Sequence, residues 1–165
     1  MPANETLPPF QALVDEHSRA VGAFLRGMLG PDDAEDALQE TYLAALRAYR
    51  GFDGANPRAW LFTIARHKAI DRARVAGRQP VALAEPDLVA ATEPEGDSTN
   101  GEVWSAVADL PPKQREAVLL RFAADLRYRE IGLAMECSEA AARRNVHEAI
   151  TKLRQSSEVK REVRI

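Results

Sequence analysis

The chain has 165 residues, of which 45% are apolar and 28% charged, and a formal net charge of −3. This length allows one domain or two small ones with modest hydrophobic cores. With one cysteine, no basic apolar leader and no apolar run long enough for a bilayer, we expect a cytoplasmic protein without an internal disulfide or direct membrane insertion.

The first predicted element is an amphipathic helix that begins near Phe10 and ends at Gly30 and Pro31. Its apolar face is formed by residues at helical spacing, namely Phe10, Leu13, Val14, His17, Val21, Phe24, Leu25 and Met28. His17 lies on this face with no second ligand at metal spacing, so we interpret it as a packed core histidine.

An acidic helix is predicted next. Five carboxylates fall within nine residues that contain no Lys or Arg: Asp32, Asp33, Glu35, Asp36 and Glu40. Carboxylates are favourable in a first helical turn, where they meet unpaired backbone donors and the positive end of the macrodipole. The spacing of Leu38, Tyr42, Ala45 and Tyr49 then predicts one buried stripe.

A short loop, Gly51 to Asn56, separates this helix from a basic one that Pro57 begins. We expect Leu61, Ile64, Ala65 and Ala69 to face inward, and Trp60 to lie on the side of Ile64. Six Lys or Arg stand between Arg58 and Arg78 against the single acid Asp71. On a chain of negative total charge, this asymmetry indicates an anionic partner.

Residues 77–101 read as a flexible acidic linker, because they carry three prolines and five acids but only one basic residue. Beyond it, Trp104, Val107 and a helix begun by Pro111 and Pro112 should pack together. Tyr128 to Met135 would form a supporting helix, and Ser138 would cap a longer helix that runs to about Arg154. Helical patterns dominate throughout, so the predicted fold is all-α, with two small helical modules joined by the linker.

These segments resemble a known family. The strings DAEDALQE, WLFTIAR and AIDRAR in the first half closely resemble conserved region 2 of the extracytoplasmic-function (ECF) sigma factors, the small sigma-70 type subunits that direct bacterial RNA polymerase to promoters. LPPKQREAVLLRF and LRYREIGLAMECSEAAARRNVHEAITKLR resemble their conserved region 4, a helix-turn-helix unit. The resemblance implies region 2 at residues 7–76, region 4 at 102–155 and a tail at 156–165.

The resemblance also implies partners and sites. Core RNA polymerase would be bound through the beta-prime clamp helices and the beta flap, with the clamp contacts made by Asp33, Asp36, Gln39 and Glu40. Promoter DNA would be the second partner, and an anti-sigma factor is the expected third. The minus-10 contacts implied by the resemblance are Phe52 and Asn56 in the loop, followed by Arg58, Arg66, His67, Lys68, Asp71, Arg72 and Arg74.

In region 4, the exposed face of the last helix would enter the minus-35 major groove, where Arg reads guanine and Asn reads adenine. The implied minus-35 residues are Arg127, Arg129, Ser138, Arg143, Arg144, Asn145, His147 and Lys152. We also expect Lys113 and Arg115 to contact phosphates.

The chain departs from the family pattern at several positions. Many relatives have Asn where His67 stands, the tight turn normally carries Gly where Glu136 stands, and a Ser cap is usual at Arg127. A non-Gly residue at positive φ costs about 1 kcal/mol, and Arg127 leaves Glu130 with half of a capping box. Asn145 and Glu148 also stand where Arg is common, so the minus-35 preference is expected to be weak or unusual.

Other interpretations stay open. Cys137 can be a small apolar plug between helices or a redox-sensing thiol, and the linker can follow a path through the polymerase or act as a solvated tether. The chain could also be a sigma-like decoy that sequesters an anti-sigma factor, or a stand-alone helix-turn-helix regulator. An enzyme is not expected, because no phosphate loop, catalytic triad or metal-ligand spacing is present, and neither cofactor nor metal is implied.

Overall fold

The computed structural model describes residues 7–75 and 105–163, with side chains described as far as residue 156. All regular elements within these ranges are helices, so the all-α prediction is confirmed. The predicted linker at 77–101 and Trp104 lie outside the described residues. No helix in the described ranges is both long and apolar enough to cross a membrane.

The N-terminal module, residues 7–75, consists of α1 (Phe10–Leu29), α2 (Pro31–Ala48), the short 3-10 helix η2 (Tyr49–Gly51) and α3 (Pro57–Val75). The predicted helix start at Pro57 agrees with these bounds, whereas Pro31, which was predicted to help end the first helix, is the first residue of α2. The three long helices pack on one another around the edge-to-face pair of Phe24 and Phe62, whose ring centroids are 5.9 Å apart. Both phenylalanines are fully buried, which fixes α3 against α1.

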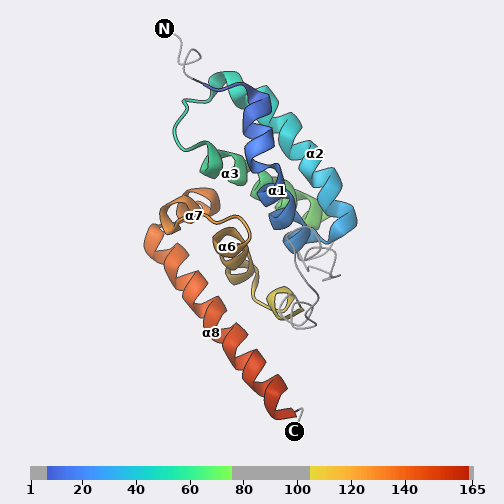
Figure 1. Ribbon diagram of the computed structural model, residues 1–165, viewed down its shortest axis with the longest axis vertical. Coiled ribbons are helices and arrows are strands. Elements are labelled where there is room, and N and C mark those ends of the chain that lie inside the picture. The colour runs from blue at the N-terminus through green and yellow to red at the C-terminus, as the bar shows by residue number, and fades with distance from the viewer. Residues whose placement is uncertain (1–6, 76–104, 164–165) are drawn as a thin grey trace.

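The C-terminal module, residues 105–163, consists of a short helix at 105–108, α6 (Pro112–Phe122), α7 (Tyr128–Met135) and α8 (Glu139–Val163). The bounds predicted for α7 are those observed. The last helix is longer than predicted, because it continues past Arg154 to Val163 and extends away from the other helices (Figure 1). The predicted tail is therefore helical for most of its length.

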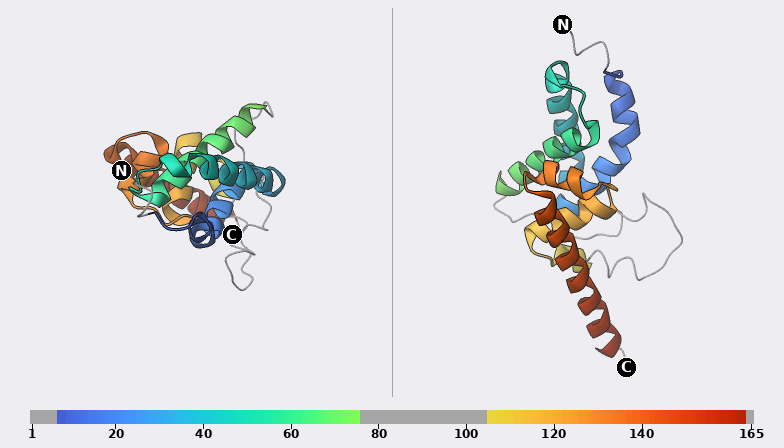
Figure 2. Two further views of the ribbon diagram at one scale, coloured as in Figure 1. Left: turned by 90° about the horizontal axis from the view of Figure 1, so that it is seen from above. Right: turned by 90° about the vertical axis from the view of Figure 1, so that its left-hand side faces the viewer.

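The two modules lie against each other. Figure 2 shows α6 and α7 beneath α1 and α3 from a second direction, and the buried apolar residues of both modules form one continuous cluster. Close approach depends on Gly27 of α1, where an added Cβ would lie 2.7 Å from the Cδ2 atom of Leu119 in α6. A gap of that size is too short for ordinary packing, so a side chain at position 27 would force the Leu119 side chain to move from its place between the modules.

His17 is buried in α1, with 6% of its surface exposed, as expected for a core histidine. Burial lowers its pKa below the usual 6.5, because the charged ring loses hydration; nearby Arg58 lowers it further, whereas Glu16 and Glu130 oppose the shift.

A pH dependence of stability follows. Because the folded pKa of His17 is depressed, its ring binds a proton more readily in the unfolded chain, so the free energy of unfolding should be fully retained above about pH 6.5 and fall as the pH drops below it. Denaturant titrations from about pH 7 to about pH 5.5 test this. In a His17→Gln variant, the free energy of unfolding should fall less over this pH range. An equal fall in both proteins would contradict the assignment of this pH dependence to His17.

Candidate functional site

The four residues of α2 that were predicted to bind polymerase divide into two groups by exposure. Asp36 and Gln39 are exposed, with 64% of the Asp36 side chain open to solvent. Asp33 and Glu40 are only partly exposed and turn towards α3. The four residues predicted to bind polymerase therefore do not form one uniform patch.

Arg72 of α3 is the point on which the acidic residues converge. Its guanidinium donates a hydrogen bond of 2.9 Å to Oε1 of Glu40, and it lies 3.7 Å from Asp33 and 3.6 Å from Asp36. The Glu40 hydrogen bond is the main cause that raises the pKa of Arg72, and the neighbouring carboxylates add to it against the effect of burial. Arg72, predicted on the minus-10 surface, thus connects α2 and α3 within one module.

Replacing Arg72 by Met should lower the free energy of unfolding by about 1 kcal/mol, because a partly exposed ion-pair network contributes little more than this. The matched control is Arg74→Met on the same helix, since Arg74 is exposed and has no ion pair among the described residues. Chemical denaturation measures the difference. Equal stability of the two variants would show that the Arg72 network contributes nothing.

Sequence reasoning missed two exposed leucines on α2. Leu43 and Leu46 each expose 53% of their surface and continue the exposed stripe that begins at Asp36 and Gln39. Their exposure could have been predicted from the sequence, because neither leucine lies on the predicted buried stripe of Leu38, Tyr42 and Ala45. An acidic and amide end followed by an apolar end is a composition suited to a protein partner.

The loop between α2 and α3 is held rigidly by aromatic packing. Phe52 is buried and stacks on Trp60, with ring centroids 4.3 Å apart, and Tyr49 lies beside both rings. Asn56, at a positive φ of 47°, caps α3 because its Oδ1 accepts a hydrogen bond from the Ala59 amide. Both predicted base-contacting residues of the loop therefore have structural contacts in this conformation.

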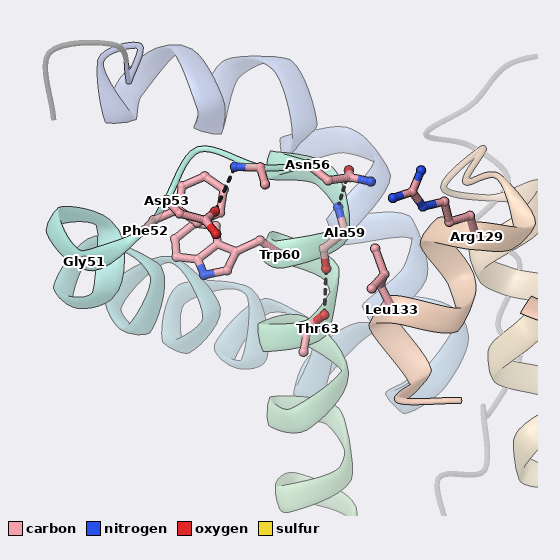
Figure 3. Close-up of a pocket in the computed structure, with 10 residues that line it drawn as sticks. Gly51, Phe52, Asp53, Asn56, Ala59, Trp60, Thr63, Arg129 and Leu133 are labelled. Carbon is pink, nitrogen blue, oxygen red and sulfur yellow. Dashed lines mark hydrogen bonds between the residues drawn. The ribbon is translucent and has the colours of Figure 1, made fainter. Parts of the chain in front are cut away.

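An open pocket of about 600 Å³ lies between this loop and α7 (Figure 3). The loop and the start of α3 form most of its wall, with Phe52, Asn56 and Trp60 on that side. Arg129 and Leu133 of α7 form the opposite side. Residues predicted for minus-10 and minus-35 contacts thus face the same space.

Three of the predicted minus-10 residues on α3 contact the C-terminal module. Arg58 donates to the backbone carbonyls of Ala124 and Asp125, at 2.8 and 2.6 Å. Arg66 pairs with Glu116 at 3.0 Å, and His67 with Glu136 at 3.2 Å. His67 and Glu136 are two of the positions at which the sequence departs from the family pattern.

Three further residues of α3 that were predicted to contact the minus-10 element differ from these in their contacts and exposure. Asp71 and Arg74 are exposed and Lys68 is half-buried. Among the described residues, no hydrogen bond or ion pair engages Lys68 or Arg74. These two cations are therefore free for an anionic partner in the observed conformation.

The C-terminal module has the geometry of a helix-turn-helix unit. Glu136 adopts the left-handed conformation, with φ 57° and ψ 44°, at the turn where the sequence predicts positive φ. The Ser138 hydroxyl accepts a hydrogen bond from the Ala141 amide, as expected of a cap. Glu130 accepts one from the Arg127 amide, which is the half capping box predicted, because an Arg side chain has no acceptor to complete it.

The exposed face of α8 carries most of the residues predicted to contact the minus-35 element. Arg144, His147 and Lys152 are exposed, and Asn145 is half-buried. Arg143 is exposed but lies over the Tyr128 ring, 5.0 Å from its centroid, and pairs with Glu139 at 3.3 Å. Arg127 and Arg129, from the start of α7, are exposed, and Arg129 lines the pocket opposite the loop at 51–56.

The expected phosphate contact of Arg115 is wrong. Only 3% of this residue is exposed, and its guanidinium donates to the carbonyls of Ala108 and Leu110 at 2.8 and 3.0 Å. Burial lowers the pKa of Arg115. The Arg115 side chain thus holds the segment before α6 in place. Its position near the N-terminus of α6 suggested an exposed residue, but it is part of the core.

A capped helix-turn-helix unit with arginines on its recognition helix is typical of DNA-binding proteins that act in transcription. The fold and the exposed arginines of α8 place this chain in that class. Comparison with known proteins gives the family. The chain matches sigma-70 region 2 over residues 13–79 and sigma-70 region 4 over residues 100–153. It belongs to the ECF RNA polymerase sigma factors.

Individual relatives span nearly the whole chain. The ECF sigma factor SigX of Bacillus subtilis is 30% identical over 93% of this chain and 86% of its own length. CarQ of Myxococcus xanthus, an RNA polymerase sigma factor, is 31% identical over 88% of this chain and 87% of its own. The chain is therefore an ECF-type sigma factor, which binds core RNA polymerase and directs promoter-specific transcription initiation.

Solved structures agree in fold. CnrH, in complex with the cytosolic domain of CnrY, superposes with a TM-score of 0.70 at 26% identity, over 91% of this chain and 88% of CnrH. The sigma factor RpoE of Bartonella quintana, in complex with the anti-sigma factor NepR, gives 0.78 at 24% identity, over 93% of this chain and 99% of its own.

Proposed function

We propose that this sigma factor contacts core polymerase through the exposed stripe of α2, and that Leu43 and Leu46 belong to that contact together with Asp36 and Gln39. The proposal rests on the position of this stripe. Its residues are exposed to solvent, whereas α3, on the other side of the module, packs against α7. Carboxylate and amide groups fix the register of an interface, and exposed leucines supply apolar area.

The promoter would be read by the other two surfaces. The loop at 51–56 and the cations of α3 suit the opened strand of the minus-10 element, because a single strand is held by phosphate contacts and stacking. Arg144 and its neighbours on α8 suit the minus-35 major groove. Residues 7–76 and 102–155 would then act as regions 2 and 4, joined by 77–101, and the chain would act by binding alone, without catalysis.

The helix-turn-helix geometry argues against the decoy interpretation. Despite Glu136, the left-handed turn and the Ser138 cap are both formed, so the unit keeps the shape that DNA reading requires. We also propose that the chain acts in the cytoplasm and that an anti-sigma factor is a further partner. The second proposal is supported by the complexes in which CnrH and RpoE were solved.

A photo-cross-linking experiment tests the polymerase contact. A photoreactive phenylalanine analogue placed at Leu43 should cross-link to the largest polymerase subunit in the assembled holoenzyme. The same analogue at Gln11, an exposed position on α1, is the control and should give no such product. Equal cross-linking from both positions, or from neither, would refute the assignment of the α2 stripe.

A further inference from the structure

The segment that leads into α1 lies against the loop that joins α2 to α3. Residues 7–10 run beside the end of α2 and the start of that loop (Figure 1). Gly54 in the loop has a positive φ of 86°, and a Cβ at this position would lie 3.3 Å from the Cδ2 atom of Leu7. The side chain of Leu7 therefore covers the backbone of the loop directly.

Tyr49 connects this segment to the loop. Its hydroxyl donates a hydrogen bond to the carbonyl oxygen of Pro8, and its ring centroid lies 5.2 Å from that of Phe10. The same ring lies 6.4 Å from Phe52 and 6.1 Å from Trp60. Because only 8% of Tyr49 is exposed, its hydroxyl depends on the Pro8 carbonyl more than on water as an acceptor.

Two consecutive prolines make the segment a stiff support. A proline ring holds φ at about −65°, and Pro9 is extended, with φ −54° and ψ 140°. The Pro9 carbonyl accepts hydrogen bonds from the amides of Ala12 and Leu13, at 2.9 and 3.4 Å, which join the segment to the first turn of α1. Little conformational entropy is lost when so restricted a chain presents the Pro8 carbonyl to Tyr49.

The loop itself has mainly local support. The Phe52 amide donates to the Tyr49 carbonyl at 3.2 Å, and the Ala55 amide donates to the Asp53 carboxylate at 2.8 Å. Asn56 has a positive φ of 47°, a strained conformation that persists only where surrounding contacts fix it. The contacts with residues 7–10 tie this loop to a second, distant part of the chain.

We propose that residues 7–10 form a positioning strap, which holds the loop at 51–56 in the conformation that receives the opened minus-10 strand. Tyr49 is the positioning residue through which the strap acts. Residues 7–10 do not line the pocket between the loop and α7, so they act on a bound strand through the loop and not by contact. The strap also precedes the match to sigma-70 region 2, which begins at residue 13. The inference rests on the proposed role of the loop in minus-10 binding.

Two substitutions loosen the strap from opposite sides in the full-length chain. Tyr49→Phe keeps the ring and removes only the hydroxyl, and Leu7→Ala removes the apolar group that covers Gly54. The control for the first is Tyr42→Phe, which removes a tyrosine hydroxyl from α2 away from the loop. The control for the second is Leu29→Ala, which truncates a half-buried leucine at the other end of α1 and lowers stability without touching the strap.

Fluorescence of Trp60 gives the conformational readout, because its ring stacks on Phe52 with centroids 4.3 Å apart (Figure 3). The chain has two tryptophans, so every protein in the series carries Trp104→Phe to leave Trp60 as the single reporter. Acrylamide should quench Trp60 more strongly in Tyr49→Phe and Leu7→Ala than in the native chain, and both controls should keep the native value. Unchanged quenching in both test variants would refute the strap.

Strand selectivity of the holoenzyme gives the functional readout. A pool of random single-stranded oligonucleotides is selected on the native holoenzyme, and each variant is then compared on an enriched oligonucleotide and its scrambled form. Loss of one hydrogen bond should lower the affinity of Tyr49→Phe for the enriched strand by about fivefold. The scrambled strand, held by phosphate contacts, should bind as before. Leu7→Ala should lose selectivity in the same way, and both controls should keep it.

Three results would count against the inference. A loosened loop with native strand selectivity would overturn the positioning role of the strap. An equal loss of selectivity in Leu29→Ala would show that general destabilisation, and not the strap, is the cause. A native holoenzyme that enriches no sequence, with the quenching results as expected, would instead refute the proposed role of the loop in minus-10 binding and, with it, the inference that rests on that role.

Discussion

Replacing Asp36 and Gln39 together by alanine should weaken binding to core RNA polymerase by at least about 100-fold, because the few hot-spot residues of an interface each contribute about 2 kcal/mol or more and we expect this pair to include one. Both side chains are exposed on α2, so the fold should persist: Arg72 keeps its 2.9 Å hydrogen bond to Glu40 when the weaker Asp36 contact at 3.6 Å is lost. Affinity is measured by titrating labelled chain with core polymerase.

The control for this variant has the same chemistry at another place. Gln11 and Asp15 are an exposed amide and carboxylate on α1, joined by a hydrogen bond of 2.9 Å. Replacing both by alanine removes the same groups from an exposed helical face without touching α2. Native polymerase affinity is expected for this control, and an equal loss in both double variants would show that the α2 stripe has no special role.

The charge-reversing substitution Arg144→Glu should reduce minus-35-dependent transcription by about 100-fold while leaving polymerase binding intact. An arginine that reads a base contributes about 1–3 kcal/mol of discrimination, and an acid in its place also repels phosphate. We expect Arg144 to matter more than Arg143, because Arg143 is engaged by Tyr128 and Glu139 in the free protein. Transcription from a promoter with an intact or scrambled minus-35 element measures the effect.

Arg154→Glu on the same helix is the control for charge. Arg154 is exposed but lies about 15 Å further along the helix axis, given a rise of roughly 1.5 Å per residue. Base contacts come from the start of a recognition helix, so this variant should keep minus-35 dependence. If Arg144→Glu also keeps it, the assignment of the recognition face is wrong.

Local signals account for the parts of the fold that could be predicted. Pro31, Pro57 and Pro112 begin helices where their fixed φ and missing amide are favourable, and Ser138 caps α8. The left-handed turn at Glu136 was foreseen because the family places Gly there. Each of these signals lies within a few residues of the feature it determines.

The contacts between distant segments could not be predicted in this way. Arg58, Arg66 and His67 looked like free cations in sequence, yet their partners are 50 to 69 residues away. Arg115 appeared exposed and is buried, because its acceptors depend on how the segment before α6 folds back. Pairing over such separations depends on tertiary packing, which hydrophobic periodicity does not encode.

The most direct test of the central claim is to pass the purified chain with bacterial core RNA polymerase over a sizing column, and then to map transcription start sites on genomic DNA with the complex. Stable co-elution and new, discrete start sites are the predicted result. A chain that elutes apart from core polymerase and creates no start sites would contradict its assignment as a working sigma factor.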